Sequence, residues 1–129
     1  MAHTKETNIL VIGSGLAGSV AALTAAEENK KVILITGSNT LLSGNTKWAQ
    51  GGIAYSHQKD SKAIFQEDIY NAGGYHNRES AVEQLVDKGP KLIEQLLIKQ
   101  LNIPFEKDKN NKLHFTSEAA HSLDRIAHC

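Results

Sequence analysis

The chain has 129 residues, enough for one domain around one hydrophobic core. Hydrophobic residues make up 40% of it and charged residues 22%, a composition that excludes a disordered or fibrous protein. Lys plus Arg and Asp plus Glu number 14 each, so the charge gives no support for a nucleic acid or an anionic membrane as partner.

The sequence also indicates in which cellular compartment the protein is found. No run of residues reaches the ~20 apolar positions that a transmembrane helix requires. Residues 9–26 have the apolar character of a secretory segment, but their three spaced glycines and the strand that follows favour a folded start. The single cysteine, Cys129, excludes an internal disulfide and suits a reducing compartment. We therefore expect a soluble cytoplasmic protein.

A glycine-rich turn near the N-terminus is the first functional signal. Residues 8–12 predict a strand and residues 19–28 a helix of small side chains, with a G-x-G-x-x-G pattern between them. The glycines permit a tight turn, close approach of a pyrophosphate and close packing of the helix on the sheet, and helix N-terminal amides face the phosphates. A bare structural turn is the weaker alternative. The pattern predicts a dinucleotide site formed by Gly13, Ser14, Gly15, Leu16, Ala17 and Gly18.

Residues 31–36 predict a second, parallel strand, which completes a βαβ unit. A dinucleotide site usually has Asp or Glu at the end of this strand, where the carboxylate binds the ribose hydroxyls. Here the strand ends without an acidic residue, so Thr36, Ser38 or a backbone group would take that role. The missing acidic residue weakens the case for a nicotinamide cofactor and is compatible with a flavin cofactor.

Residues 43–54 are mostly small or hydroxyl residues around one tryptophan, with no period of 2 or 3.6. Such a stretch is typical of a loop whose backbone approaches a ligand. The alternative, favoured by composition alone, is a glycine-rich turn into a strand over residues 53–56.

Together the glycine pattern and the stretch Ala49-Gln50-Gly51-Gly52-Ile53-Ala54 resemble the flavoprotein family of fumarate reductases, succinate dehydrogenases and L-aspartate oxidases. The resemblance implies FAD, held at the flavin by Asn45, Thr46, Lys47, Trp48, Ala49, Gln50, Gly51 and Gly52. Members that attach FAD covalently carry a histidine just before the threonine of this segment. This chain has Asn45 there, which implies non-covalent FAD and favours the L-aspartate oxidases.

Residues 60–72 predict a helix, capped by Asp60 or Ser61 and ended by the two glycines that follow it. Residues 78–88 predict a second helix, capped by Asn77. The apolar spacing of these segments indicates core packing more than a partner-binding groove.

A third helix is predicted over residues 91–100, starting with Pro90 in its first turn after a break at Gly89. Residues 103–106 and 113–116 alternate in polarity around a turn-rich stretch, which predicts a β-hairpin. Pro104 restricts its first arm to a sheet edge.

The stretch Thr116-Ser117-Glu118-Ala119-Ala120-His121-Ser122, before a predicted helix over residues 123–128, is a second point of resemblance. L-aspartate oxidases carry Thr-Arg-Glu-Gly-Gly-His-Ser there, followed by a helix with basic residues and isoleucine. Arg125 and Ile126 also match, whereas Ser117 replaces the arginine and Ala119 and Ala120 replace the glycines. The resemblance implies that Glu118 orients the substrate through its α-ammonium, a cation that succinate lacks.

His121, Asp124 and His128 fall on one face of the predicted terminal helix, beside Cys129. No second cluster of ligands accompanies them and none has the close spacing of a zinc site, so we expect no metal. No Ser-His-Asp pattern is visible either.

The resemblance implies an α/β fold: the N-terminal part of a Rossmann-like FAD-binding domain, with helices and a β-hairpin added. It implies oxidation of L-aspartate to iminosuccinate, by hydride transfer from C2 to flavin N5, in quinolinate and NAD biosynthesis. Oxygen or fumarate would reoxidise the flavin. The alternatives are a fumarate reductase or succinate dehydrogenase flavoprotein, and a non-catalytic dinucleotide-binding module.

Family members are several times longer than this chain. We therefore expect residues 1–129 to be a truncated N-terminal part of an FAD-binding domain, inactive on its own because the proton-transfer residues are missing. The sequence predicts no oligomeric state.

Overall fold

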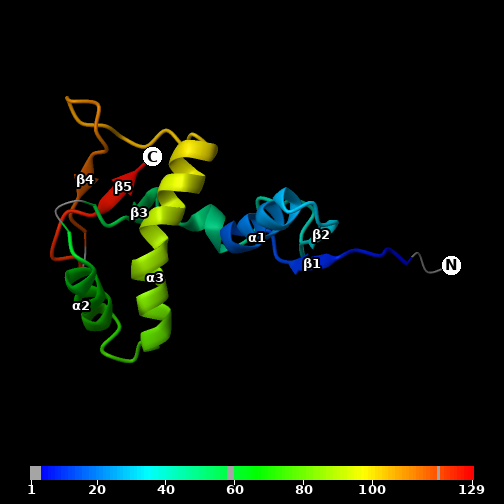
Figure 1. Ribbon diagram of the computed structural model, residues 1–129, viewed down its shortest axis with the longest axis horizontal. Helices are drawn as coiled ribbons and strands as arrows, with labels where there is room; N and C mark the ends of the chain where they lie inside the picture. The colour runs from blue at the N-terminus through cyan, green and yellow to red at the C-terminus, as the bar shows by residue number, and fades with distance from the viewer. Residues whose placement is uncertain (1–3, 58–59, 119) are drawn as a thin grey trace. The chain divides into compact units, whose positions relative to one another are not determined.

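The computed structural model describes residues 4–57, 60–118 and 120–129. The chain divides into two compact units, Met1–Gln50 and Gly51–Cys129 (Figure 1). One α/β unit carries the predicted dinucleotide turn, and the other contains helices and an antiparallel sheet.

Unit 1 is the predicted βαβ unit. Strand β1 (Ile9–Ile12) and strand β2 (Val32–Ile35) are parallel and in register, and α1 (Leu16–Glu27) connects them. The helix ends where Asn29 adopts a left-handed φ of 56°, a conformation that asparagine tolerates better than most residues. The parallel pair of strands with its crossover helix confirms the predicted fold class.

Unit 1 has no core of its own. None of its described residues is buried, and Ile12 and Leu42 are 78% and 77% exposed. Parallel strands are normally covered on both faces. What holds this unit together is therefore its backbone hydrogen bonding and the contact of α1 with the strands.

Unit 2 has a small hydrophobic core formed by its two longest helical segments. Helix α2 (Lys62–Ala72) starts where predicted, with the Ser61 hydroxyl accepting a hydrogen bond from the Ile64 amide at 3.2 Å. Phe65 of α2 packs on Val82 and Val86 of α3 (Glu79–Leu92), and all three side chains are buried.

The predicted break at Gly89 and the separate helix starting at Pro90 are wrong. Helix α3 continues through both residues and runs directly into a π-helical segment, η2 (Ile93–Gln100). Proline removes one intrahelical hydrogen bond, and a change of helical winding next to it is an ordinary response. The buried valine face of α3 outweighs the local preference for a break.

The predicted Asn77 cap is also wrong, because the residue that precedes α3 is Arg78 and its side chain makes no capping bond. Asn77 instead lies against the end of α2. A Cβ added to Gly73 would come within 2.2 Å of Asn77 Oδ1, so this asparagine occupies the space that the glycine leaves open.

The sheet of unit 2 consists of β3 (Gly52–Ala54), β5 (Ile126–His128) and β4 (Phe115–Thr116), antiparallel in the order β3-β5-β4. The helix predicted over residues 123–128 is therefore wrong. A six-residue helix is unstable alone, whereas pairing with strands on both sides satisfies the backbone groups of β5. As a result, His121, Asp124 and His128 do not share a helix face.

The predicted hairpin is present in its inner part. Lys107 and Leu113 form an antiparallel bridge, and Asp108 N donates to Lys112 O at 2.7 Å across the turn. The two predicted arms also pair next to this bridge, where His114 N donates to Glu106 O at 2.9 Å. Both arms contact β5 as well: Phe115 pairs with it in β4, and Glu106 N donates to His128 O at 2.8 Å.

A buried arginine connects the two ends of unit 2. Arg125 has no exposed surface, and its Nε and Nη2 donate to the two carboxylate oxygens of Asp60, each at 2.8 Å. Its Nη1 pairs with Asp68, and its guanidinium lies 4.5 Å from the centre of the Phe65 ring. Asp68 Oδ2 also accepts from the amide and the hydroxyl of Ser122, both at 2.9 Å.

Asp68 makes the stability of unit 2 depend on acid. Burial opposes its ionisation, but the Ser122 amide, the Arg125 guanidinium and the Ser122 hydroxyl outweigh that effect and lower the pKa of Asp68. Because the folded pKa lies below the ordinary value of 3.8, the ionised carboxylate stabilises the fold above pH 3.8. This contribution is lost as the pH falls through the folded pKa.

We therefore expect Asp68→Asn to lower the free energy of unfolding at neutral pH by about 2 kcal/mol, since a charge-assisted hydrogen bond is lost beside a buried cation. The difference from wild type should shrink as the pH falls below 3.8 and through the lowered pKa of the folded Asp68 carboxyl, where the wild-type side chain also becomes neutral. Urea unfolding followed by circular dichroism measures both quantities. Asp87→Asn removes the exposed ion pair with Lys62 and is the control, with little expected effect. A D68N variant as stable as wild type would contradict the assignment.

Candidate functional site

The turn between β1 and α1 has the geometry that its glycines predict. Gly13 has φ +111°, a conformation that strains other residues, and its amide donates to Ile35 O at 2.8 Å. A Cβ added to Gly18 would lie 2.0 Å from Gly13 O, so only glycine lets the helix approach the turn this closely. Each of these two glycines thus has the conformation or contact expected of it.

The amides at the start of α1 lie beside the second predicted cofactor segment. Gly15 is the N-cap of the helix, and Leu16 N donates to Thr46 Oγ1 at 3.1 Å. A Cβ on Gly15 would also lie 3.1 Å from that hydroxyl. Unit 1 therefore brings Gly15, Leu16 and Thr46 together, although Thr46 is thirty residues further along the chain.

Two serines fix the surrounding loops. Ser14 Oγ donates to Leu41 O at 2.9 Å, which ties the glycine turn to the loop after β2. Ser38, predicted near the ribose, donates to Thr40 O at 2.8 Å and accepts from Thr40 N at 3.0 Å. Its hydroxyl therefore closes a local turn in this structure, and its cofactor role stays a prediction.

The segment predicted to hold the flavin begins as a single 3-10 turn, η1 (Asn45–Trp48). Gly44, before it, has φ +101°, and Ala49 N donates to Thr46 O at 3.4 Å after it. Trp48 is 77% exposed, and Lys47 Nζ lies 5.3 Å from the centre of its ring. The boundary between the two units follows Gln50 and falls inside the predicted segment.

In unit 2 the remaining predicted site residues lie around His128 of the central strand β5. Glu118 Oε1 lies 3.0 Å from His128 Nε2, and Thr116 Oγ1 lies 2.9 Å from the same nitrogen. Gly52 pairs with His128 in the β3–β5 ladder, and Gly51 O accepts from the Cys129 amide at 3.0 Å. Glu118, 42% exposed at its side chain, thus lies near the predicted flavin glycines.

His128 is the residue that sequence reasoning missed at this corner. The incorrect terminal helix placed it on an outward face with His121 and Asp124. Its pairing with Gly52 depends on residues far apart in the chain, and no local pattern indicates it.

The other residues of the motif around Glu118 are structural. Ser122 binds Asp68, His121 Nδ1 lies 3.1 Å from Arg125 Nη1, and Arg125 is buried. They anchor the loop that carries Glu118. Ala119, one of the two alanines in place of glycine, lies outside the described residues.

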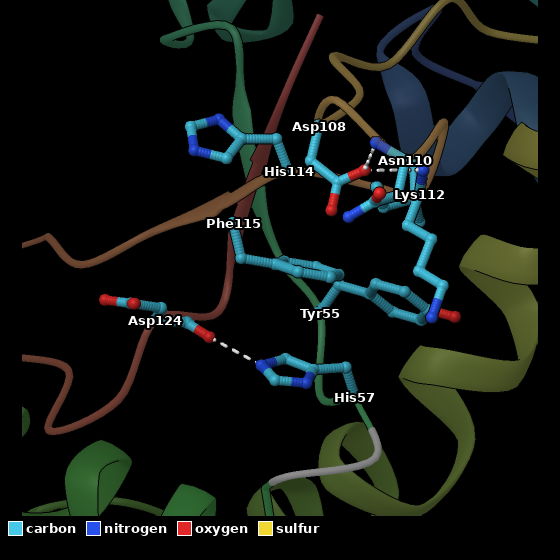
Figure 2. A pocket seen from close by; sticks show the side chains of 9 residues that line it. Tyr55, His57, Asp108, Asn110, Lys112, His114, Phe115 and Asp124 are labelled. Carbon is cyan, nitrogen blue, oxygen red and sulfur yellow. Dashed lines mark hydrogen bonds between the residues drawn. The ribbon is translucent and has the colours of Figure 1, made fainter.

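A cavity of about 730 Å³ opens next to the hairpin of unit 2 (Figure 2). Figure 2 shows the rings of Tyr55 and His57 next to that of Phe115, with ring centres 5.8 Å and 4.5 Å from the Phe115 centre. The cavity is lined by Tyr55, His57, Asp108, Asn110, Lys112, Leu113, His114, Phe115 and Asp124. None of the residues predicted from the sequence to bind cofactor or substrate lines it.

The charges around this cavity are mixed. The Asp108 carboxylate accepts from the amides of Asn110 and Lys112, at 2.8 and 2.9 Å, and these bonds lower its pKa. Asp108 therefore closes the hairpin turn. The side chains of the lining select neither an anion nor a cation.

Among residues 4–57, 60–118 and 120–129, no group of three or more His, Cys, Asp or Glu side chains could hold a metal ion. Within the same residues, no helix has the length and apolar character to cross a membrane.

Comparison with known families gives one match over nearly the whole chain. The family described as FAD binding domain matches residues 8–129. This range includes the glycine turn, the η1 segment and Glu118.

Curated relatives that match over the length of the chain are L-aspartate oxidases. The enzyme of Halobacterium salinarum is 37% identical over 128 residues, which cover 99% of this chain and 24% of the relative. The enzyme of Clostridium acetobutylicum is 34% identical over 95% of this chain and 27% of the relative. The chain thus spans about a quarter of the length of these relatives.

Solved structures of an Sdh1 complex and of a quinol fumarate reductase share the fold. The Mycobacterium smegmatis Sdh1 complex matches with a TM-score of 0.84 and 25% identity, over 95% of this chain and 21% of that one. An Escherichia coli quinol fumarate reductase chain matches with a TM-score of 0.84 at 23% identity, over 94% and 21%.

The contact at Gly18 gives a direct test. We expect Gly18→Ala to push α1 from the turn, to destabilise unit 1 by about 2 kcal/mol as overpacking does, and to weaken dinucleotide binding. Amide hydrogen exchange in β1 and β2 and titration with FAD measure the two effects. Gly89→Ala is the matched control, because no atom lies within 4 Å of its added Cβ. Unchanged exchange and FAD affinity in G18A would refute the close-contact role.

Proposed function

The chain belongs to the FAD binding domain family, and from this membership we propose that it is the N-terminal part of the FAD-binding domain of an L-aspartate oxidase. The intact enzyme would oxidise L-aspartate to iminosuccinate, for quinolinate and NAD biosynthesis. The whole-chain similarity to L-aspartate oxidases of bacteria and an archaeon supports this proposal. The single cysteine fits a reducing compartment, so we propose the cytoplasm as its location.

FAD fits the residues of unit 1. The helix start beyond Gly15 presents backbone amides and the positive end of the helix dipole, which suit a pyrophosphate. Gly13, Ser14, Gly15, Leu16, Ala17 and Gly18 would hold that group. The hydrogen bond between Leu16 and Thr46 connects the glycine turn to η1, the start of the segment predicted to hold the flavin. We propose that residues 45–52 hold the flavin and that Ser38 lies toward the ribose.

The single observation that carries the substrate proposal is the Glu118 carboxylate at the sheet edge. Its side chain is 42% exposed and lies on the loop between β4 and β5, near Gly52. A carboxylate attracts the α-ammonium of L-aspartate and repels a dicarboxylate that has no ammonium. Glu118 therefore favours an amino-acid substrate over succinate.

Each part of the chain has a separate task in this reaction. FAD supplies the hydride-accepting chemistry when it is bound. Glu118 would bind the ammonium and so fix the orientation of substrate C2. The buried Arg125 and Asp68, together with Ser122, would keep the Glu118 loop in place. Groups that bind the substrate carboxylates and move the proton would lie in the remainder of the enzyme.

A second candidate is the flavoprotein of a succinate dehydrogenase or fumarate reductase, favoured by the Mycobacterium smegmatis Sdh1 structure and its TM-score of 0.84. Glu118 argues against it, because succinate offers no cation. A non-catalytic dinucleotide-binding module is a third possibility. It predicts that the 129 residues fold alone as a monomer that does not bind the hydrophobic dye ANS.

The substrate proposal predicts which compound reduces the flavin. In the FAD-loaded protein expressed from the complete reading frame, L-aspartate should bleach the flavin absorbance without oxygen, and succinate should not. Reduction by succinate alone would establish the second candidate. The DNA after the codon for Cys129 shows whether the frame continues into the rest of an FAD domain.

In the same protein, Glu118→Gln should raise KM for L-aspartate by about tenfold or more, since a hydrogen bond to a charged group is lost. Glu106→Gln is the matched control, because Glu106 is an exposed glutamate that pairs with a histidine on the hairpin. Equal KM values in E118Q and wild type would remove Glu118 from the substrate site.

The attachment of the flavin is open to a simple measurement. Asn45 stands where covalent relatives carry histidine, so we expect acid or urea denaturation to release all the FAD into the supernatant. Flavin fluorescence that stays on the denatured chain in a gel would show a covalent bond and contradict this proposal.

A further inference from the structure

We propose that His128 is the positioning residue for Glu118: its imidazole fixes the carboxylate that selects an ammonium-bearing substrate. This inference rests on the proposed function, because it assumes that Glu118 meets the substrate. It adds a residue that the sequence patterns place elsewhere, and it concerns only groups within unit 2.

The contact geometry assigns the tautomer of His128. Its Nε2 lies 3.0 Å from Glu118 Oε1 and 2.9 Å from Thr116 Oγ1. A lone pair on Nε2 would face a carboxylate oxygen that has only lone pairs of its own. The Nε2 atom must therefore carry a proton and donate a hydrogen bond to Glu118 Oε1. The Thr116 hydroxyl oxygen is a second, neighbouring acceptor.

The backbone pairing of β5 and the space above Gly52 fix the position of the His128 ring. His128 lies in the central strand, paired with Gly52 of β3, and its carbonyl accepts from Glu106 N at 2.8 Å. A Cβ on Gly52 would lie 3.0 Å from His128 Cε1 and 3.2 Å from Nδ1, so the ring lies directly over the glycine. The absence of a side chain at Gly52 gives the ring its place.

This arrangement suits a carboxylate that must keep its charge. Glu118 lies in an irregular loop, and its Oε1 is held by His128. In this proposal Oε2 binds the substrate cation. The Nε2–H group fixes one oxygen of the carboxylate, whereas a lysine or arginine in its place would bring a permanent positive charge that competes with the ammonium. His128 should therefore affect the binding of L-aspartate and leave the binding of succinate, which has no ammonium, unchanged.

The test uses the FAD-loaded protein from the complete reading frame and two ligands. His128→Phe removes the donor, and we expect KM for L-aspartate to rise about tenfold. The Kd for succinate, measured from the change in the flavin spectrum, should stay within about twofold, since neither group binds it. His128→Gln restores an N–H donor and should recover most of the loss.

A double variant separates positioning from a general structural role. If His128 acts through Glu118, the H128F change should add little to KM once Glu118→Gln is present. His114→Phe is the matched control, because His114 pairs with Glu106 at 3.8 Å on the exposed hairpin and should leave KM unchanged. Equal losses for both ligands, additive effects in the double variant, or no effect of H128F would each overturn the proposal.

An NMR measurement keeps the inference separate from the proposed function. Long-range ¹H–¹⁵N spectra of the protein should show His128 protonated at Nε2, with a change in that signal in E118Q but not in E106Q. An Nδ1-protonated ring would overturn the pairing whatever the substrate is. If L-aspartate fails to reduce the wild-type flavin while the Nε2–H form is found, the proposed function fails and the His128–Glu118 pairing remains.

Discussion

The arrangement of unit 2 depends on the buried ion pairs of Arg125. Its guanidinium binds both oxygens of Asp60, just before α2, and also Asp68 within that helix. Removing these charges from water is costly, and the arrangement is stable because nearly every donor and acceptor is matched. Through Ser122, which shares Asp68, the same network holds the loop that leads back to Glu118. A residue with no contact to any ligand thereby determines where the exposed carboxylate stands.

Unit 1 is held together in a different way. It has no buried side chain among its described residues, and its precision comes from backbone contacts around two glycines. The approach of Gly18 to Gly13 O fixes the helix to the turn, and the bond from Leu16 N to Thr46 brings a distant segment to the helix start. Unit 1 therefore gains little stabilisation from burying apolar side chains, and the backbone amides at the start of α1 remain near its surface.

The sequence predicts those features that depend on neighbouring residues. The strand, glycine turn, helix and second strand of unit 1 follow from local patterns, as does the Ser61 cap of α2. Predictions failed where distant contacts decide the outcome: β5 is a strand because β3 and β4 pair with it, and α3 passes Pro90 because its valine face is buried. Glu118 could be singled out only through resemblance to a family, and its contact with His128 required the sheet.

The strand order β3-β5-β4 also dictates when unit 2 can assemble. Neither β3 nor β4 pairs with the other, and both precede β5 in the chain. During synthesis, therefore, β3 has an open edge until the central strand has left the ribosome. Asp60 and Asp68 likewise have no ion-pair partner until Arg125 has been synthesised. Helices α2 and α3, whose contacts are local, can form first, and the corner that holds Glu118 is completed last.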